Sequence, residues 1–266
     1  MPEQTYALIT GASSGIGECF ARALAARGRN LVLVARSQDK LTALAQELGA
    51  KHAVRAEVVP LDLSETGAAV RLAQLLRERN LAVDLLISDA GFGAHGEFWE
   101  LPLERQVRML HLNIQALVEL TYLLLPAMIE ARRGAIVNVS STASFQPVPY
   151  TTVYSATKAF VTSFSMALAE ELRPHGIRVV TLCPGGTRTN FFDASQYAKR
   201  DFAGGLQAPE EVVRVGLKAL ERGGGLVISG LINKLQIASQ RLAPRALVAR
   251  LAAQMFRPKK PASGRR

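Results

Sequence analysis

The sequence predicts an α/β fold in which a single doubly wound parallel sheet of about seven strands, a Rossmann fold, carries helices on both faces. Short aliphatic runs, apolar enough for burial on both faces, alternate along the chain with stretches of helical period. Repetition of strand, helix and strand implies parallel strands joined by right-handed crossovers. With 266 residues, of which 48% are hydrophobic, the chain is long enough to bury a full-sized core.

The elements follow one another from the N-terminus without an internal repeat or a Ser/Gly-rich linker. The predicted strands are residues 6–10, 31–35, 57–61, 85–88, 135–140, 178–183 and 226–229. The predicted helices are residues 15–28, 38–48, 65–79, 103–131, 153–173 and 209–222. Residues 1–229 therefore form one predicted domain. The connection at 186–207 is long and rich in aromatic residues and glycine, which is typical of a lid over a binding site.

A C-terminal tail, residues 230–266, follows this domain. It contains two apolar, basic helical segments separated by Pro244 and ends in a PKKPASGRR run that we expect to be disordered. The chain has 32 Lys and Arg against 22 Asp and Glu, and its last acidic residue is Glu221. Residues 222–266 hold 10 basic residues and no acidic one, so the net charge of +10 belongs to this C-terminal part, of which the tail is most, and residues 1–221 are neutral.

The tail has two interpretations. Apolar residues recur at helical spacing with basic residues among them, which suits either a lid or dimer helix with a solvated basic face, or a segment that contacts an anionic membrane surface. The apolar positions are Leu231, Leu235, Ala238, Leu242, Leu247, Leu251 and Met255, and the basic ones are Lys234, Arg241, Arg245 and Arg250. Nucleic-acid binding ranks below both, because stacking aromatics are missing between the basic residues. Without a signal peptide or an uncharged apolar run of membrane-spanning length, we expect a cytoplasmic protein with, at most, peripheral membrane contact.

A glycine-rich turn, T-G-A-S-S-G-I-G, directly follows the first predicted strand and opens the first helix. Gly11, Gly15 and Gly17 would let the backbone approach a pyrophosphate, which the unpaired N–H groups of the helix N-terminus would bind. At the end of the second strand stands Arg36, with no carboxylate before Asp39. A cation there suits a 2′-phosphate, so the sequence favours NADP(H) over NAD(H), unless Arg36 is simply a solvated surface residue.

A second motif, Y-S-A-T-K, places Tyr154 and Lys158 on one face of a helix. A neighbouring ammonium group favours the phenolate, so we expect Lys158 to lower the pKa of Tyr154 and prepare it for proton exchange with a substrate oxygen. Ser141 follows the strand at 135–140. Ligands of such sheets bind at the carboxyl ends of the strands, where this hydroxyl would lie.

These motifs, with the tract at 88–91, Asn113 and Pro184-Gly185, resemble the short-chain dehydrogenase/reductase family over residues 5–229. The resemblance implies that Tyr154 is the general acid in carbonyl reduction, that Lys158 binds the nicotinamide ribose, that Ser141 orients the carbonyl and that Asn113 holds a relay water. It also implies homodimers or homotetramers formed through the helices at 103–131 and 153–173.

The resemblance further implies a set of cofactor contacts, in which Asp62 accepts from the adenine amino group. The family usually reads Asn-Asn-Ala-Gly where this chain has Ser88-Asp89-Ala90-Gly91, and a carboxylate accepts hydrogen bonds but cannot donate one as an amide does. The implied cofactor contacts are Gly11, Ser13, Ser14, Gly15, Ile16, Gly17, Arg36, Asp62, Leu63, Asp89, Ala90, Gly91, Tyr154, Lys158, Pro184, Gly185, Thr187 and Thr189.

We expect apolar side chains to line the part of the site where the substrate lies over the nicotinamide. Such a lining suits a 3-oxoacyl, steroid-like or other aromatic or aliphatic ketone better than a sugar or a charged acid. The alternative is a dinucleotide-binding sensor or scaffold without turnover, and the four scattered histidines suggest no metal site. The substrate-binding residues expected beside Ser141 and Tyr154 are Phe92, Phe145 and Phe191, with Phe98, Trp99, Phe192 and Tyr197 in the same segments.

Overall fold

The sheet of this protein is fully parallel. In a computed structural model, which describes residues 4–191, 205–240 and 243–258, the strand order is β3-β2-β1-β4-β5-β6-β7. All the predicted strands are confirmed, with ends that differ by three residues or fewer. The strands are β1 (Thr5–Thr10), β2 (Asn30–Ala35), β3 (Ala56–Pro60), β4 (Ala82–Ser88), β5 (Gly134–Val139), β6 (Ile177–Cys183) and β7 (Gly225–Ile228).

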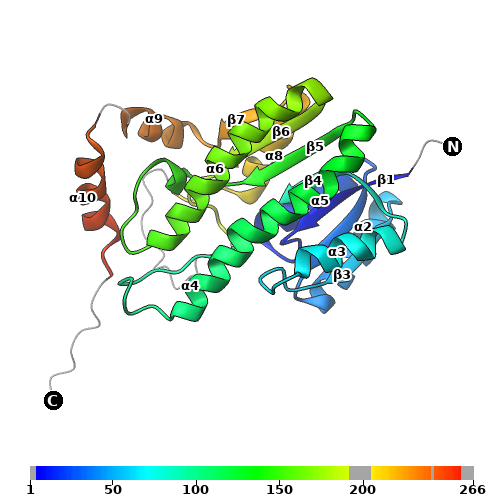
Figure 1. Cartoon of the computed structure of the whole chain (residues 1–266), viewed down its shortest axis with the longest axis horizontal. Helices are drawn as coiled ribbons and strands as arrows, with labels where there is room; N and C mark the ends of the chain where they lie inside the picture. The colour runs from blue at the N-terminus through cyan, green and yellow to red at the C-terminus, as the bar shows by residue number, and fades with distance from the viewer. Residues whose placement is uncertain (1–3, 192–204, 241–242, 259–266) are drawn as a thin grey trace, which may run out of the picture.

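Helices cover both faces of the sheet, which confirms the doubly wound fold (Figure 1). Helices α1, α2 and α8 share one buried apolar layer with the strands, and α3, α5 and α6 share the other. The bounds are α1 (Gly15–Ala25), α2 (Gln38–His52), α3 (Ala68–Glu78), α4 (Leu103–Leu110), α5 (Ala116–Glu130), α6 (Thr152–Leu172), α8 (Pro209–Glu221), α9 (Leu231–Gln240) and α10 (Arg245–Phe256). Two 3₁₀ turns, η2 (Thr142–Phe145) and η3 (Arg173–His175), flank α6.

Consecutive apolar residues in a strand serve opposite layers of the core. Ile9 of β1 packs with α1 and α8, whereas its neighbour Leu8 packs with α3 and α5. Both side chains are fully buried. A strand covered on both faces has no solvent side, so it carries an unbroken apolar run rather than an alternating one.

The helix expected at 103–131 is divided. Helix α4 passes through a π-helical turn, η1 (His111–Gln115), into α5. The wider turn directs Asn113 inward, where it is buried. The stretch Leu103–Glu130 is long and apolar enough to cross a membrane by length and composition, and α5 packs in this fold against β4, β5 and α3.

The two tail helices, α9 and α10, lie at the end of the molecule opposite the N-terminus, and Pro244 separates them as expected (Figure 1). The strands run toward this end, because β1 starts near the N-terminus. The tail therefore lies on the side of the carboxyl ends of the strands, where a ligand of an open α/β sheet would bind.

We expect Phe20→Ala to lower the free energy of unfolding by about 3–5 kcal/mol, because the ring of this α1 residue is fully buried in the layer shared with α8. Urea unfolding followed by circular dichroism measures the change. Phe98→Ala is the matched control, since the Phe98 side chain is 54% exposed and should change stability by less than about 0.5 kcal/mol. Equal losses in the two variants would contradict this account of the core.

Candidate functional site

A cavity of about 410 Å³ opens at the carboxyl ends of β1, β2, β4, β5 and β6. It brings together nearly all of the residues expected from the sequence. Those that line it are Gly11, Ser13, Ser14, Gly15, Ile16, Arg36, Asp62, Leu63, Asp89, Ala90, Gly91, Phe92, Ser141, Tyr154, Lys158, Pro184, Gly185, Thr187, Thr189 and Phe191. Gly17 and Asn113 lie directly behind the wall, and Phe145 is not part of the lining.

The glycine turn forms one end of the cavity. Gly11 and Gly15 have positive φ values of 74° and 63°, which side chains rarely tolerate. A Cβ on Gly17 would lie 2.5 Å from the Gly11 carbonyl oxygen, so only glycine allows α1 to start this close to the turn. The helix thus presents its N-terminus to the cavity through Gly15 and Ile16.

Thr10 holds the neighbouring strand end in place, a role that the sequence analysis missed. Its hydroxyl accepts hydrogen bonds from the backbone N–H groups of Asp89, at 3.1 Å, and Ala90, at 3.0 Å. This fixes the segment after β4 against the turn after β1. A hydroxyl residue as the last position of the first strand is the sequence signal that could have indicated it.

Polar residues surround the opening beyond β2 and β3. Arg36 is exposed at the rim of the cavity. Asp62 accepts hydrogen bonds from the Ser64 N–H and hydroxyl groups, at 2.9 and 2.7 Å, and Arg108 lies 3.1 Å from it. Burial alone would raise the pKa of Asp62, but these donors together with the Arg36 charge lower it. Asp62 is therefore ionised at neutral pH and remains a hydrogen-bond acceptor.

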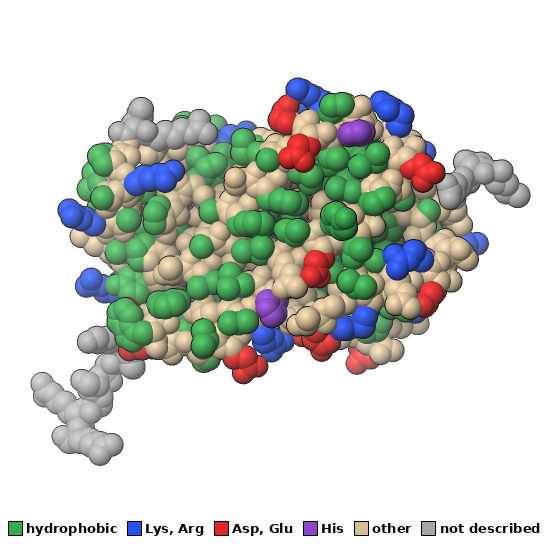
Figure 2. Space-filling view, in the orientation of Figure 1, with side chains coloured by type: hydrophobic (Ala, Val, Ile, Leu, Met, Phe, Trp, Pro, Cys, Tyr) green, Lys and Arg blue, Asp and Glu red, His purple; other side chains and the backbone are tan. Residues whose placement is uncertain are grey.

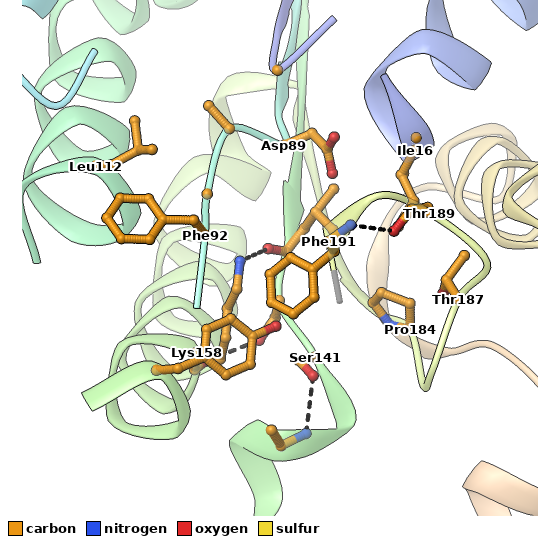
Figure 3. A pocket seen from close by; sticks show the side chains of 18 of the residues that line it. Ile16, Asp89, Phe92, Leu112, Ser141, Lys158, Pro184, Thr187, Thr189 and Phe191 are labelled. Atoms are coloured by element: carbon orange, nitrogen blue, oxygen red, sulfur yellow. Dashed lines mark hydrogen bonds between the residues drawn. The ribbon is translucent and has the colours of Figure 1, made fainter. Parts of the chain in front are cut away.

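The motif residues of α6 meet Ser141 at the other end of the cavity (Figure 3). Lys158 donates to the Val139 carbonyl at 2.8 Å, and its Nζ lies 5.9 Å from the centre of the Tyr154 ring. Burial lowers the pKa of Lys158 to about 8. Burial also raises the pKa of Tyr154 to about 12, although the Ser141 hydroxyl lowers it.

The pKa of Tyr154 is raised, whereas the helix spacing led us to expect that Lys158 would lower it. The sequence places Lys158 on the correct face of the helix, but it does not show that the Tyr154 phenol and the Lys158 amine are both buried. Desolvation disfavours the phenolate and the ammonium alike, and it is the largest cause of both pKa shifts. Tyr154 is therefore a protonated phenol at neutral pH.

Asn113 supports the cavity from behind. Its amide oxygen accepts from the Phe92 N–H at 3.2 Å, and its amide nitrogen donates to the Phe92 carbonyl and to the Thr157 hydroxyl, both at 3.0 Å. The π-helical turn thus ties the segment after β4 to α6. Relay of a proton through a water held by Asn113 stays a prediction.

Asp89 stands where the family usually has asparagine, beside the start of α1. Burial raises its pKa to about 7, while Lys158 and the Gly17 N–H favour the ionised form. The Gly17 contact is close, since a Cβ on that glycine would lie 2.9 Å from Asp89 Oδ2. In Figure 3 the Asp89 side chain points into the same space as Phe191 and Lys158.

The far end of the cavity is apolar, but not through all the expected side chains. Phe92 and Phe191 line it, with the Phe191 ring 5.3 Å from that of Tyr154. Phe98 and Trp99 are 54% and 77% exposed and, like Phe145, are not among the described residues that line the cavity, so their contact with a substrate stays a prediction. A loop sequence does not fix the direction of its side chains. Phe192 and Tyr197 lie outside the described residues.

Tail residues also line this end of the cavity, although the sequence analysis names none of them as a site residue. The cavity residues of α9, at positions 233, 236, 237 and 240, share one face of that helix, whereas Met255 of α10 has the four-residue spacing of Leu247 and Leu251. The tail residues in the lining are Asn233, Gln236, Ile237 and Gln240 from α9, and Met255 and Phe256 from α10.

We expect Asp89→Asn to change how stability depends on pH. A carboxyl whose pKa is raised on folding favours the folded state when protonated, so its contribution is full near pH 4 and is lost as the pH rises through about 7. Asparagine keeps that contribution at every pH. The variant should therefore gain more than about 1 kcal/mol over the parent between pH 5 and pH 8, measured by urea unfolding. Asp39→Asn, at an exposed position, is the control, and parallel pH profiles for parent and Asp89→Asn would disprove the assignment.

Comparisons with known proteins agree with this geometry. The family model described as short chain dehydrogenase matches residues 5–200. A very-long-chain 3-oxoacyl-CoA reductase of Phaeosphaeria nodorum is 34% identical over 231 residues, which cover 84% of this chain and 65% of that protein. The chain thus spans about two thirds of the length of this curated relative.

Two solved structures are similar over nearly their whole length. A short-chain dehydrogenase from Sphingobium yanoikuyae in complex with NADPH is 32% identical, with a TM-score of 0.81 and coverage of 98% of this chain and 99% of that one. The bulky-bulky ketone specific alcohol dehydrogenase from Comamonas testosteroni is 30% identical, with a TM-score of 0.76 and 98% coverage of both. The fold, the glycine turn and the matched residues together lead to one conclusion: this chain belongs to the short-chain dehydrogenase family.

Proposed function

We propose that this protein is an NADP(H)-dependent oxidoreductase that interconverts a carbonyl and an alcohol on a small apolar substrate. One observation carries the proposal. A single cavity holds a phosphate-type glycine turn at one end and the Ser141, Tyr154 and Lys158 side chains at the other. Residues 1–229 would form the catalytic unit, and 186–207 its lid.

The cavity fits a dinucleotide. The closely packed glycines leave the space for a pyrophosphate at the N-terminus of α1, and Arg36 at the rim offers a cation to a 2′-phosphate. Asp62, held as an acceptor, suits an adenine amino group. The Sphingobium yanoikuyae relative, whose structure contains NADPH, supports the choice of cofactor. When bound, NADPH would supply the hydride.

The chain itself would supply the proton. Since burial keeps Tyr154 protonated at neutral pH, its phenol can donate to the carbonyl oxygen while the carbonyl carbon accepts the hydride. The Ser141 hydroxyl, beside the phenol, would orient the same oxygen. Lys158, held by the Val139 carbonyl, would bind the nicotinamide ribose and offer positive charge as the phenolate forms.

The apolar end of the cavity supports the proposed substrate class. Phe92, Val148, Phe191 and Ile237 line it, and they suit an aliphatic or aromatic ketone or a 3-oxoacyl chain. The names of the relatives, a 3-oxoacyl-CoA reductase and a bulky ketone alcohol dehydrogenase, point to the same class.

Oligomerisation is proposed through α4, α5 and α6. Figure 2 shows hydrophobic side chains spread over the face that α5 and α6 occupy in Figure 1. A second copy of the chain, in a homodimer or homotetramer, would cover this face. Its exposed large apolar residues are Leu103, Val107, Leu110, Tyr122, Phe160 and Met166.

We expect Tyr154→Phe to reduce kcat for ketone reduction by roughly 10²–10⁴-fold, because it removes the transferable proton and keeps the ring. NADPH affinity should remain nearly unchanged. NADPH oxidation with a panel of apolar ketones measures kcat, and fluorescence titration measures the affinity for NADPH. Tyr122→Phe, on the exposed face of α5, is the control. A Tyr154→Phe enzyme with more than about a tenth of the parent kcat would remove the phenol from the mechanism. No turnover by the parent on any ketone would favour a sensor.

We expect Arg36→Ala to weaken NADPH binding by roughly tenfold to a hundredfold and to leave NADH binding unchanged, because only NADPH carries the 2′-phosphate. Titrating both cofactors against both proteins gives the four affinities. Lys40→Ala, an exposed cation on α2, controls for general loss of charge. Equal affinity of the parent for NADH and NADPH would refute the cofactor preference.

A further inference from the structure

The outward sides of the tail helices carry large aliphatic residues that the fold leaves uncovered. On α9 the side chains of Leu231, Ile232 and Leu235 are 72%, 52% and 62% exposed. On α10 those of Leu247 and Leu251 are 47% and 56% exposed. Leu231 and Leu235, like Leu247 and Leu251, are four residues apart and so lie on one face of their helix. We call these five residues, together with the basic residues Lys234, Arg245 and Arg250, the tail surface.

The charge of the tail surface has one sign. Lys234, Arg245 and Arg250 are exposed among the aliphatic residues. Glu221 is the last acidic residue of the chain, and the ion pairs among the described residues include none of these three cations. In Figure 2 hydrophobic and basic side chains lie together at the end that α9 and α10 occupy in Figure 1.

The inward sides of the same helices are fixed to the cavity. Ile237 is buried and lines the cavity from α9. At the end of α10, His95 Nε2 lies 2.8 Å from the Phe256 carbonyl oxygen, and Arg257 Nε donates to the Tyr150 hydroxyl at 3.3 Å. The tail is thus the wall between the apolar end of the cavity and the tail surface.

We propose that the tail surface binds the anionic face of a lipid bilayer and sets the apolar end of the cavity against it. Apolar side chains insert below the headgroups while the cations contact lipid phosphates, an arrangement that suits an amphipathic helix lying in the interface. Delivery of an apolar carbonyl substrate from the lipid to the cavity follows from this orientation, and that part rests on the proposed function.

The composition of the tail surface argues against a second copy of the chain and against nucleic acid as its partner. A two-fold contact between copies of this surface would set cations against cations, because the tail offers no carboxylate to pair with them. Nucleic acid would match the charge, but the tail surface lacks the stacking aromatics and leaves its leucines without a partner.

Co-flotation of the full chain with vesicles tests the binding. The chain should float with phosphatidylcholine vesicles that contain phosphatidylglycerol, and much less with phosphatidylcholine alone or in high salt. Combining Lys234→Gln, Arg245→Gln and Arg250→Gln should lower the partition coefficient on the order of a hundredfold, roughly fivefold for each charge. Combining Leu231→Ser, Leu235→Ser and Leu251→Ser should lower it more than about tenfold.

The matched control combines Lys51→Gln, Arg77→Gln and Lys218→Gln, three exposed cations on α2, α3 and α8. It should float like the parent. Failure of the parent to float, or an equal loss in the control, would overturn the proposal. A change of oligomeric state in the leucine variant, measured by light scattering with no change in flotation, would instead assign the surface to a second copy.

Delivery from the lipid has its own readout. Anionic vesicles should increase reduction of a long-chain aliphatic ketone dissolved in them more than that of a short water-soluble ketone, and the three-cation variant should lose the difference. Its activity on the short ketone should match that of the parent. No activity on either ketone would refute the proposed function and leave flotation to decide on the surface.

Discussion

The close approach of helix α1 to the turn after β1 is the contact on which the site depends. At Gly17 the helix backbone lies so near the Gly11 carbonyl that a Cβ on Gly17 would be only 2.5 Å from the carbonyl oxygen. A Cβ on Gly11 would meet the Ala90 backbone nitrogen at 3.0 Å, so the segment after β4 is held to the same turn. Three chain segments therefore meet with no Cβ at Gly11 or Gly17 to hold them apart, and the space that remains in front of them is the phosphate end of the cavity. A larger residue at Gly11 would push the turn after β1 away from the segment after β4, and one at Gly17 would push α1 away from that turn, both at the edge of the sheet where ligands bind.

Desolvation governs the electrostatics at the other end. Asp89, Tyr154 and Lys158 are all shifted toward their neutral forms, because the same apolar surroundings penalise each charge. The Val139 carbonyl and the Gly17 N–H offset part of this cost for Lys158 and Asp89 respectively. Burial thus brings the pKa values of Asp89, about 7, and Lys158, about 8, close to neutral pH, whereas it keeps Tyr154, with a pKa of about 12, protonated. A bound ligand that brings its own charge would change that balance.

The parts of the fold that could be predicted from the sequence are those with a local cause. Leu8 and Ile9 reveal a strand buried on both faces, and the spacing of Tyr154 and Lys158 places both on one face of α6. Facts that depend on packing were not accessible. The pKa of Tyr154 depends on how much water the fold excludes, and the exposure of Phe98 depends on contacts that no local pattern encodes.

The tail shows the same division. Its helices and its basic charge are visible in the sequence, yet the contribution of Ile237 to the cavity could not be predicted, because nothing local specifies which side of α9 meets the body. The site residues found by motif lie in a part of the chain where strand ends fix their positions. The tail helices pack back across the cavity, and no strand end fixes which of their residues reach it.

The π-helical turn at His111–Gln115 has a consequence for comparing chain lengths in this family. A π-helical turn is closed by i→i+5 hydrogen bonds and so holds about one residue more than an α-helical turn, and Met109 before it and Leu117 after it are both buried. The additional residue is taken up in the wide turn, so α4 and α5 both keep their apolar faces on the core. A chain one residue shorter at this point could bury the same core with an unbroken helix and would lose the inward amide of Asn113. A one-residue alignment gap here would therefore separate relatives by site architecture while their folds remain superimposable.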